Sequence, residues 1–155
     1  MTVLDNIIQC AQSAPKRIVL TEGEDGRILE AADRLSRDNV AKVTVLGNVK
    51  KINNTASELD LDLSEVSIID PLESSLREDL AELLLELRAK KGMTQEKAYD
   101  LAGQPLWFAN LSVKAGHQDG VVSGAVHTTG DVVRAAIQVI GVDKAFDMIS
   151  SFFLM

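Results

Sequence analysis

The stretch that decides the fold is residues 17–46, RIVLTEGEDGRILEAADRLSRDNVAKVTVL. It starts with a short β-branched apolar run over Arg17–Thr21 and closes with a second such run over Lys42–Leu46, which ends at Gly47. The residues between the two runs follow helical spacing, with an inner face made by Ile28, Ala31, Ala32 and Leu35. A strand, a helix and a second strand form a βαβ unit, which favours a parallel sheet with right-handed crossovers.

The same alternation continues along the rest of the chain. Two more strands are predicted at Val66–Ile69 and Gly120–Ser123, and a fifth over Met148–Met155. Apolar spacing and capping residues predict the helices. These are expected after the N-cap Thr2, over Leu76–Leu87, over Thr94–Ala102, over Leu106–Ala115 and over Gly130–Ile140, with a short helix and a loop in the polar stretch Lys50–Ser64. The expected fold class is α/β, a mostly parallel sheet with helices on both faces.

Composition and charge restrict the kind of protein this is. With 155 residues, 46% of them hydrophobic and 25% charged, the chain has the proportions of a globular domain rather than of a disordered one. It carries 16 Lys and Arg against 23 Asp and Glu, a net charge of −7, and such a surface repels nucleic acid and anionic lipid. Cys10 is the only cysteine, which excludes an intrachain disulfide and a cysteine metal cluster. No apolar run approaches the ~20 residues of a membrane span and no signal peptide is recognisable, so we expect a cytoplasmic protein with neither nucleic acid nor membrane as partner.

The last residues, Ser150–Met155, have the pattern of an apolar strand with no turn, cap or polar tail after it. Chain ends are usually exposed and polar, because a trailing strand leaves backbone groups unpaired. We interpret residues 1–145 as an N-terminal α/β domain and residues 146–155 as the first strand of a truncated second domain; a buried final strand is the alternative. Phe152, Phe153 and Leu154 are expected to be disordered, inserted into the sheet or paired with a second copy of the chain.

The stretch Asp119–Arg134 combines a strand, a loop of small residues and the start of a helix. The small side chains of residues 123–125, beginning with Ser123, allow the backbone to approach a ligand closely. Thr128 and Thr129 place hydroxyls beside the first N–H groups of the helix, where an anion also meets the positive end of the helix dipole. The guanidinium of Arg134 is close enough to hold the same anion in a bidentate manner. The pattern predicts a phosphate-sized anion site, with an ordinary capped helix and a surface arginine as the alternative.

These residues resemble the signature of the phosphate acetyltransferase (phosphotransacetylase) family. The matching stretches are Asp119–Thr129 with Asp131 and Arg134, Ile137–Ile140, Ser150-Ser151, Ile18–Asp25 with Arg27, and Glu86–Thr94. The resemblance runs in order along nearly the whole chain. It implies the N-terminal half of a longer enzyme built of two α/β domains, with the three-layer fold of isocitrate and isopropylmalate dehydrogenases, that face each other across a cleft.

The resemblance further implies the reversible reaction of acetyl-CoA and phosphate to acetyl phosphate and CoA, without metal or redox cofactor and with coenzyme A as a substrate. It places the general base in the family's C-terminal part, so these 155 residues hold no complete catalytic set and are expected to be inactive alone. The substrate-binding residues carried over are Arg134, Thr128 and Thr129 of the phosphate loop, with Ser123 beside them, and Arg88 and Arg27 as contacts to substrate phosphates. A homodimer is the expected assembly.

Several alternatives stay open at this point. The chain has Ala135, Gly141-Val142 and Gly26 where the family usually has proline, a Lys-Thr pair and an acidic residue, so a phosphate butyryltransferase is possible. A phosphate- or CoA-binding regulatory domain, such as the one fused behind malic enzymes, is another candidate. Individual residues also have plainer explanations. Arg88 could pair with Glu86, Arg27 could pair with Glu24 or Glu30, and His127 could be a hydrogen-bonded structural histidine.

Overall fold

The computed structural model describes residues 2–143, 145 and 149 of the chain. Its sheet consists of β1 (Lys16–Leu20), β2 (Ala41–Leu46), β3 (Ser67–Ile69) and β4 (Gly120–Val122). All described strand pairs are parallel and the strand order is β3-β2-β1-β4. This confirms the predicted parallel sheet, with each strand starting or ending within two residues of its expected bounds. The predicted strand over Met148–Met155 lies, except for Ile149, outside the described residues.

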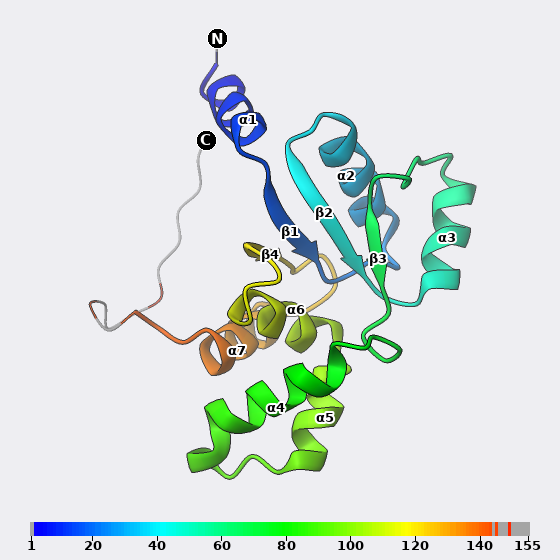
Figure 1. Cartoon of the computed structure of the whole chain (residues 1–155). Helices are drawn as coiled ribbons and strands as arrows, with labels where there is room; N and C mark the ends of the chain where they lie inside the picture. Colours follow the sequence, from blue (N-terminus) through cyan, green and yellow to red (C-terminus); the bar gives the residue numbers. More distant parts are fainter. Residues whose placement is uncertain (1, 144, 146–148, 150–155) are drawn as a thin grey trace.

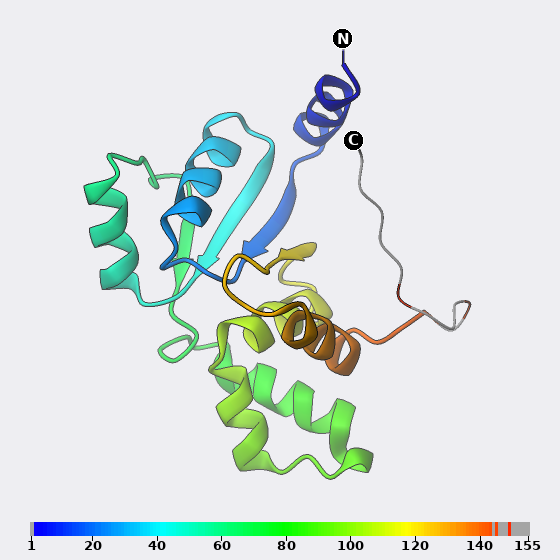
Figure 2. The ribbon, with the colours of Figure 1, turned by 180° about the vertical axis from the view of Figure 1, so that it is seen from behind.

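Helices cover both faces of the sheet (Figures 1 and 2), as predicted. On one face, α2 (Gly26–Arg37) and α3 (Val49–Glu58) enclose a core that includes Leu20, Val43 and Val45. The helices on the other face are α4 (Arg77–Arg88), α5 (Gln95–Ala102), α6 (Pro105–Lys114) and α7 (Thr129–Val139). They pack against Val19 and Leu46 around the fully buried Phe108. Successive strand residues point to opposite faces, which explains why β1, β2 and β3 each contribute to both cores.

Several helix ends follow the capping residues read from the sequence. The first helix, α1 (Val3–Ser13), begins with a capping box in which Thr2 and Asp5 exchange hydrogen bonds. Thr94 caps α5 and Thr128 caps α7 in the same way, through a hydroxyl that accepts a backbone N–H. After α4 a single 3₁₀ turn over Ala89–Lys91 ends at Gly92, whose φ of +78° is the left-handed conformation expected there. No residue of α1 is buried, and the helix stands beyond the end of the sheet (Figure 1).

The strand order places a topological switch point between β1 and β4, because β2 and β4 are added on opposite sides of β1. The chain leaves β1 toward β2 and β3 on one side, then returns to add β4 on the other. In open α/β sheets, ligands bind at the carboxyl ends of two such strands, because the loops that follow them diverge there. Arg17 and Asp119 hold β1 and β4 in register: the Arg17 guanidinium donates to the Asp119 carboxylate at 2.7 and 3.1 Å, and the Arg17 backbone N–H at 2.8 Å. These hydrogen bonds hold the pKa of Asp119 below its ordinary range.

Gly23, in the turn after β1, provides a test of how tightly this turn packs against β2. A Cβ atom at Gly23 would lie 2.3 Å from Cγ1 of Val45 and 2.7 Å from the carbonyl oxygen of Leu46. Because the second contact is with backbone, we expect Gly23→Ala to lower the free energy of unfolding by about 1–3 kcal/mol in urea titrations. Gly130→Ala is the control, since the nearest atom to its Cβ would be 3.9 Å away. Equal midpoints for the two variants would contradict the packing described here.

Candidate functional site

The loop that follows β4 wraps its backbone around a single carboxylate. Glu22, from the turn after β1, accepts hydrogen bonds from four consecutive backbone N–H groups. They are those of Gly124 at 3.1 and 3.2 Å, Ala125 at 2.9 Å, Val126 at 2.8 Å and His127 at 2.7 Å. A series of backbone N–H groups that converge in this way is an anion-binding concavity. In this structure the loop of small residues therefore binds a carboxylate of the chain itself.

Glu22 is buried and ionised. Its side chain is 3% exposed, and its Oε1 also lies 2.8 Å from Nδ1 of His127. Burial alone would raise the pKa of the carboxyl. The hydrogen bonds from the backbone of His127, Val126 and Ala125 and from the His127 ring outweigh it and lower the pKa to about 2. The loop is held by a charged group that stays charged at any physiological pH.

Further contacts connect the turn after β1 with the loop after β4. The Thr21 hydroxyl donates to that of Ser123 at 2.7 Å. Arg27, in the first turn of α2, pairs with Asp25 at 2.6 Å and reaches across to the carbonyl oxygen of Ala125 at 3.2 Å. The Arg27 side chain nevertheless remains 71% exposed. These hydrogen bonds join the turn after β1 and the loop after β4, about a hundred residues apart in sequence, into one rim.

The start of α7 carries a second carboxylate, which is held more loosely. The Thr128 hydroxyl donates to the Asp131 carboxylate at 2.7 Å and accepts the Asp131 backbone N–H at 3.2 Å. Arg134 lies 3.4 Å from the same carboxylate, and the side chains of this ion pair are 66% and 49% exposed. Exposed pairs of this kind contribute only about 0–1 kcal/mol. A substrate anion could therefore replace Asp131 as the partner of Arg134 at small cost.

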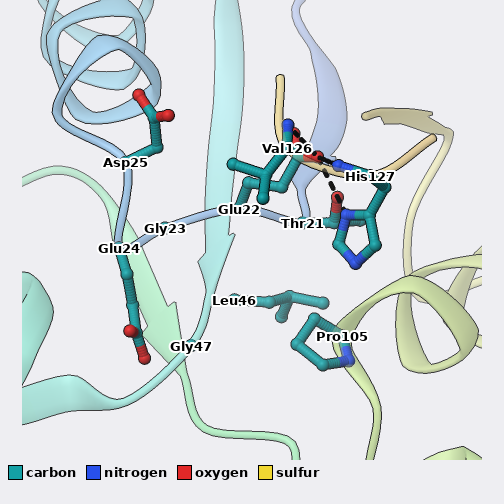
Figure 3. A pocket seen from close by; sticks show the side chains of 10 residues that line it. All are labelled: Thr21, Glu22, Gly23, Glu24, Asp25, Leu46, Gly47, Pro105, Val126 and His127. Atoms are coloured by element: carbon teal, nitrogen blue, oxygen red, sulfur yellow. Dashed lines mark hydrogen bonds and ion pairs between the residues drawn. The ribbon is translucent and has the colours of Figure 1, made fainter. Parts of the chain in front are cut away.

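A pocket of about 320 Å³ lies beside the loop, at the carboxyl ends of β1 and β2 (Figure 3). It is lined by Thr21, Glu22, Gly23, Glu24, Asp25, Leu46, Gly47, Pro105, Val126 and His127. Its volume is at the lower end of the range for small-molecule sites, ~300–1,000 Å³. Within the described residues, no group of three or more His, Cys, Asp or Glu side chains is placed to hold a metal ion. Nor, in the same part of the chain, is any helix long and apolar enough to cross a membrane.

Known protein families and solved structures resemble this chain over most of its length. Residues 2–155 match the phosphate acetyl/butaryl transferase family. This chain belongs to that family. It is 43% identical over its whole length to the phosphate acetyltransferase of Clostridium acetobutylicum and 41% identical to that of Thermoanaerobacterium thermosaccharolyticum. A solved phosphotransacetylase from Staphylococcus aureus superposes with a TM-score of 0.87 at 34% identity over 96% of this chain, and one from Streptococcus pyogenes with 0.84 at 30% identity over 90%.

The chain spans less than half the length of these relatives. It covers 46% of the C. acetobutylicum protein and 47% of the T. thermosaccharolyticum protein. The coverage is 46% and 43% for the two solved chains. The family resemblance read from the sequence is confirmed, and the match ends inside the relatives.

The residues that the family signature singled out lie in three places in the structure. Ser123 and Arg27 take part in the rim through the contacts given above, while Thr128 caps α7 and Thr129 and Arg134 belong to its first two turns. Arg88 lies apart from them, half-buried at the end of α4, which extends away from the sheet (Figure 1). None of these six predicted residues lines the pocket.

Two expectations for individual side chains are refined. The partner of Arg27 is Asp25 rather than Glu24 or Glu30, and Glu24 pairs instead with Lys51 at 2.9 Å. His127 is hydrogen-bonded, as its plainer explanation required, and its partner is Glu22. The sequence did not predict the role of Glu22, although Ile18–Asp25, the stretch that contains it, matches the family signature. No local pattern distinguishes Glu22 from its exposed neighbour Glu24, because the donors lie about a hundred residues away.

The pH dependence of stability tests the state of Glu22. Its folded pKa, about 2, is below the ordinary 4.5, so its contribution is complete above pH 4.5 and is lost as the pH falls from 4.5 to 2. We expect Glu22→Gln to lower the free energy of unfolding at neutral pH by about 2–3 kcal/mol, because the amide NH₂ would face N–H donors. Glu24→Gln, an exposed neighbour, should change it by less than about 0.5 kcal/mol. Urea titrations at several pH values measure both, and an identical acid dependence in wild type and Glu22→Gln would contradict the assignment.

Proposed function

We propose that this chain forms the phosphate-binding side of a phosphate acetyltransferase, which moves an acetyl group reversibly between coenzyme A and phosphate. The observation that carries the proposal is the loop after β4 with the start of α7, at the carboxyl ends of β1 and β4, where Arg27 reaches the loop backbone at Ala125 and Arg134 pairs with the exposed Asp131. Family membership supports the reaction class. The proposed partners are CoA, acetyl-CoA, phosphate and acetyl phosphate, with a homodimer as the assembly and the cytoplasm as the location.

The two carboxylates of the site decide where a substrate phosphate would bind. Glu22 is buried and holds four backbone N–H groups, and each hydrogen bond to a charged group contributes about 1.5–3 kcal/mol, so a phosphate would not displace it. Asp131 is half-exposed and weakly paired. We therefore place the phosphate at the start of α7, where it would replace Asp131 beside Arg134 and meet the Thr129 hydroxyl and the helix dipole.

An acidic protein needs such local cations for anionic substrates. The chain carries a net charge of −7, and its field repels phosphate and CoA at a distance. Guanidinium groups near the loop would attract such anions locally and can bind phosphate oxygens in a bidentate manner. In the proposed reaction the CoA thiolate attacks the acetyl carbonyl while these groups stabilise charge on the departing phosphate. The general base is proposed to lie in further residues that the family's longer members have.

A graft tests whether this chain binds phosphate while further residues supply the general base. Residues 1–155 would be joined to the C-terminal remainder of the C. acetobutylicum relative, and acetyl-CoA formation from acetyl phosphate and CoA would be assayed beside the 155-residue chain alone. We expect turnover by the graft and none by the chain alone. Butyryl phosphate, as a second substrate, distinguishes acetyl from butyryl transfer. Turnover by the isolated chain, or a folded graft that binds phosphate and CoA without transfer, would contradict the proposal.

Arg134 is the residue to vary in that graft. Loss of one charge-assisted hydrogen bond costs about 1.5–3 kcal/mol, so Arg134→Ala should raise the KM for phosphate or CoA, or lower kcat, about ten- to hundredfold. Arg134→Lys should recover only part of the loss, because an ammonium cannot bind in a bidentate manner. Arg34→Ala, on the exposed surface of α2, is the matched control and should leave both constants unchanged. Kinetics unchanged in Arg134→Ala would remove this residue from the site.

A further inference from the structure

The pocket of Figure 3 differs in chemistry from the proposed phosphate site. No lysine or arginine is among its lining residues, and its two outer carboxylates, Glu24 and Asp25, are already paired with Lys51 and Arg27. Leu46, Pro105 and Val126 supply apolar walls. Such a pocket suits an uncharged group and disfavours a phosphate.

One polar ring faces this pocket in a fixed orientation. His127 holds its Nδ1 2.8 Å from Glu22, and Figure 3 shows the opposite edge of the imidazole, with Nε2, on the side of Leu46 and Pro105. The His127 side chain is 32% exposed, so a ligand in the pocket can reach it. Glu22 is 3% exposed and is held by the loop amides, so its position is fixed.

The chemistry of this pair determines which ring nitrogen carries the proton. An ionised carboxylate can only accept hydrogen bonds, so Nδ1 of His127 must donate to Glu22. In the neutral ring Nε2 is then left with a lone pair and acts as an acceptor. The pocket therefore presents the Nε2 acceptor beside its apolar walls, which matches a ligand that is uncharged and carries an N–H or S–H donor.

We propose that Glu22 and His127 form a dyad that presents Nε2 of His127 as a hydrogen-bond acceptor to the uncharged thiol- and amide-bearing arm of the CoA substrate. The identity of the ligand rests on the proposed function. Of the proposed substrates, only CoA and its thioester have a long uncharged arm with such donors. In this arrangement His127 contacts the substrate and Glu22 is a positioning residue that acts through it. The start of α7 then binds the phosphate, and the pocket beside the loop after β4 binds the arm of CoA.

The first test is spectroscopic and uses the 155-residue chain without any ligand. Nitrogen-15 NMR of the His127 ring, at a pH where it is neutral, should show a protonated Nδ1 and an unprotonated Nε2. Glu22→Gln should shift the ring toward the other tautomer, while Glu30→Gln, an exposed glutamate of α2, should not. A proton on Nε2 in the wild-type chain would overturn the dyad.

The second test measures ligand binding with pantetheine and inorganic phosphate as separate probes. His127→Asn is the informative variant, because its carboxamide can still donate to Glu22 but has no group in the place of Nε2. We expect pantetheine to bind this variant about three- to tenfold more weakly, with phosphate binding unchanged. His127→Gln, whose amide can reach the Nε2 position, should recover part of the affinity, and His117→Asn, exposed after α6, is the control.

The two probes separate this inference from the proposed function. Phosphate binding that depends on Arg134, together with pantetheine binding indifferent to His127, would overturn the dyad and leave the proposed function standing. Loss of pantetheine affinity in His127→Asn, together with an inactive graft, would contradict acetyl transfer and support the dyad as a binding device. Equal loss of both probes in His127→Asn would show that His127 acts only through the fold of the loop, and would also overturn the inference.

Discussion

The buried carboxylate of Glu22 is the interaction on which the site depends. A charge taken out of water is costly unless hydrogen bonds replace its hydration, and the loop after β4 supplies them from four successive backbone N–H groups and one imidazole. The same bonds satisfy amides that a loop of small residues would otherwise leave unpaired. The carboxylate and the loop therefore each stabilise the position of the other.

The carboxylates of Glu22 and Asp131 are held with different strength. The loop binds its own carboxylate permanently, while the first turn of α7 holds Asp131 through an exposed pair that a competing anion can displace. Arg27 and Arg134 are mostly exposed to solvent. The difference between the two carboxylates is burial, not residue type, and it separates a structural anion from an exchangeable one.

The order of the strands puts these groups in one place. With β1 between β2 and β4, the turn that carries Glu22 and the loop that receives it leave the same edge of the sheet. The Arg17–Asp119 contact sets the register of β4 against β1 and thereby the distance of the loop from the turn. A sheet with β4 at the far side of β3 would contain the same residues and have no such site.

Much of this molecule follows from local sequence. Apolar runs such as Lys42–Leu46 predicted the strands, hydroxyls such as Thr94 and Thr128 predicted the caps, and the alternation of strands and helices predicted a parallel sheet, because each depends on neighbours a few residues apart. The signature around Ser123–Arg134 also identified the family before any fold was known. That the loop after β4 binds the Glu22 carboxylate could not be predicted in this way. Which of two glutamates two residues apart is buried, and which nitrogen of His127 carries a proton, is decided by strand order and register, which join groups about a hundred residues apart.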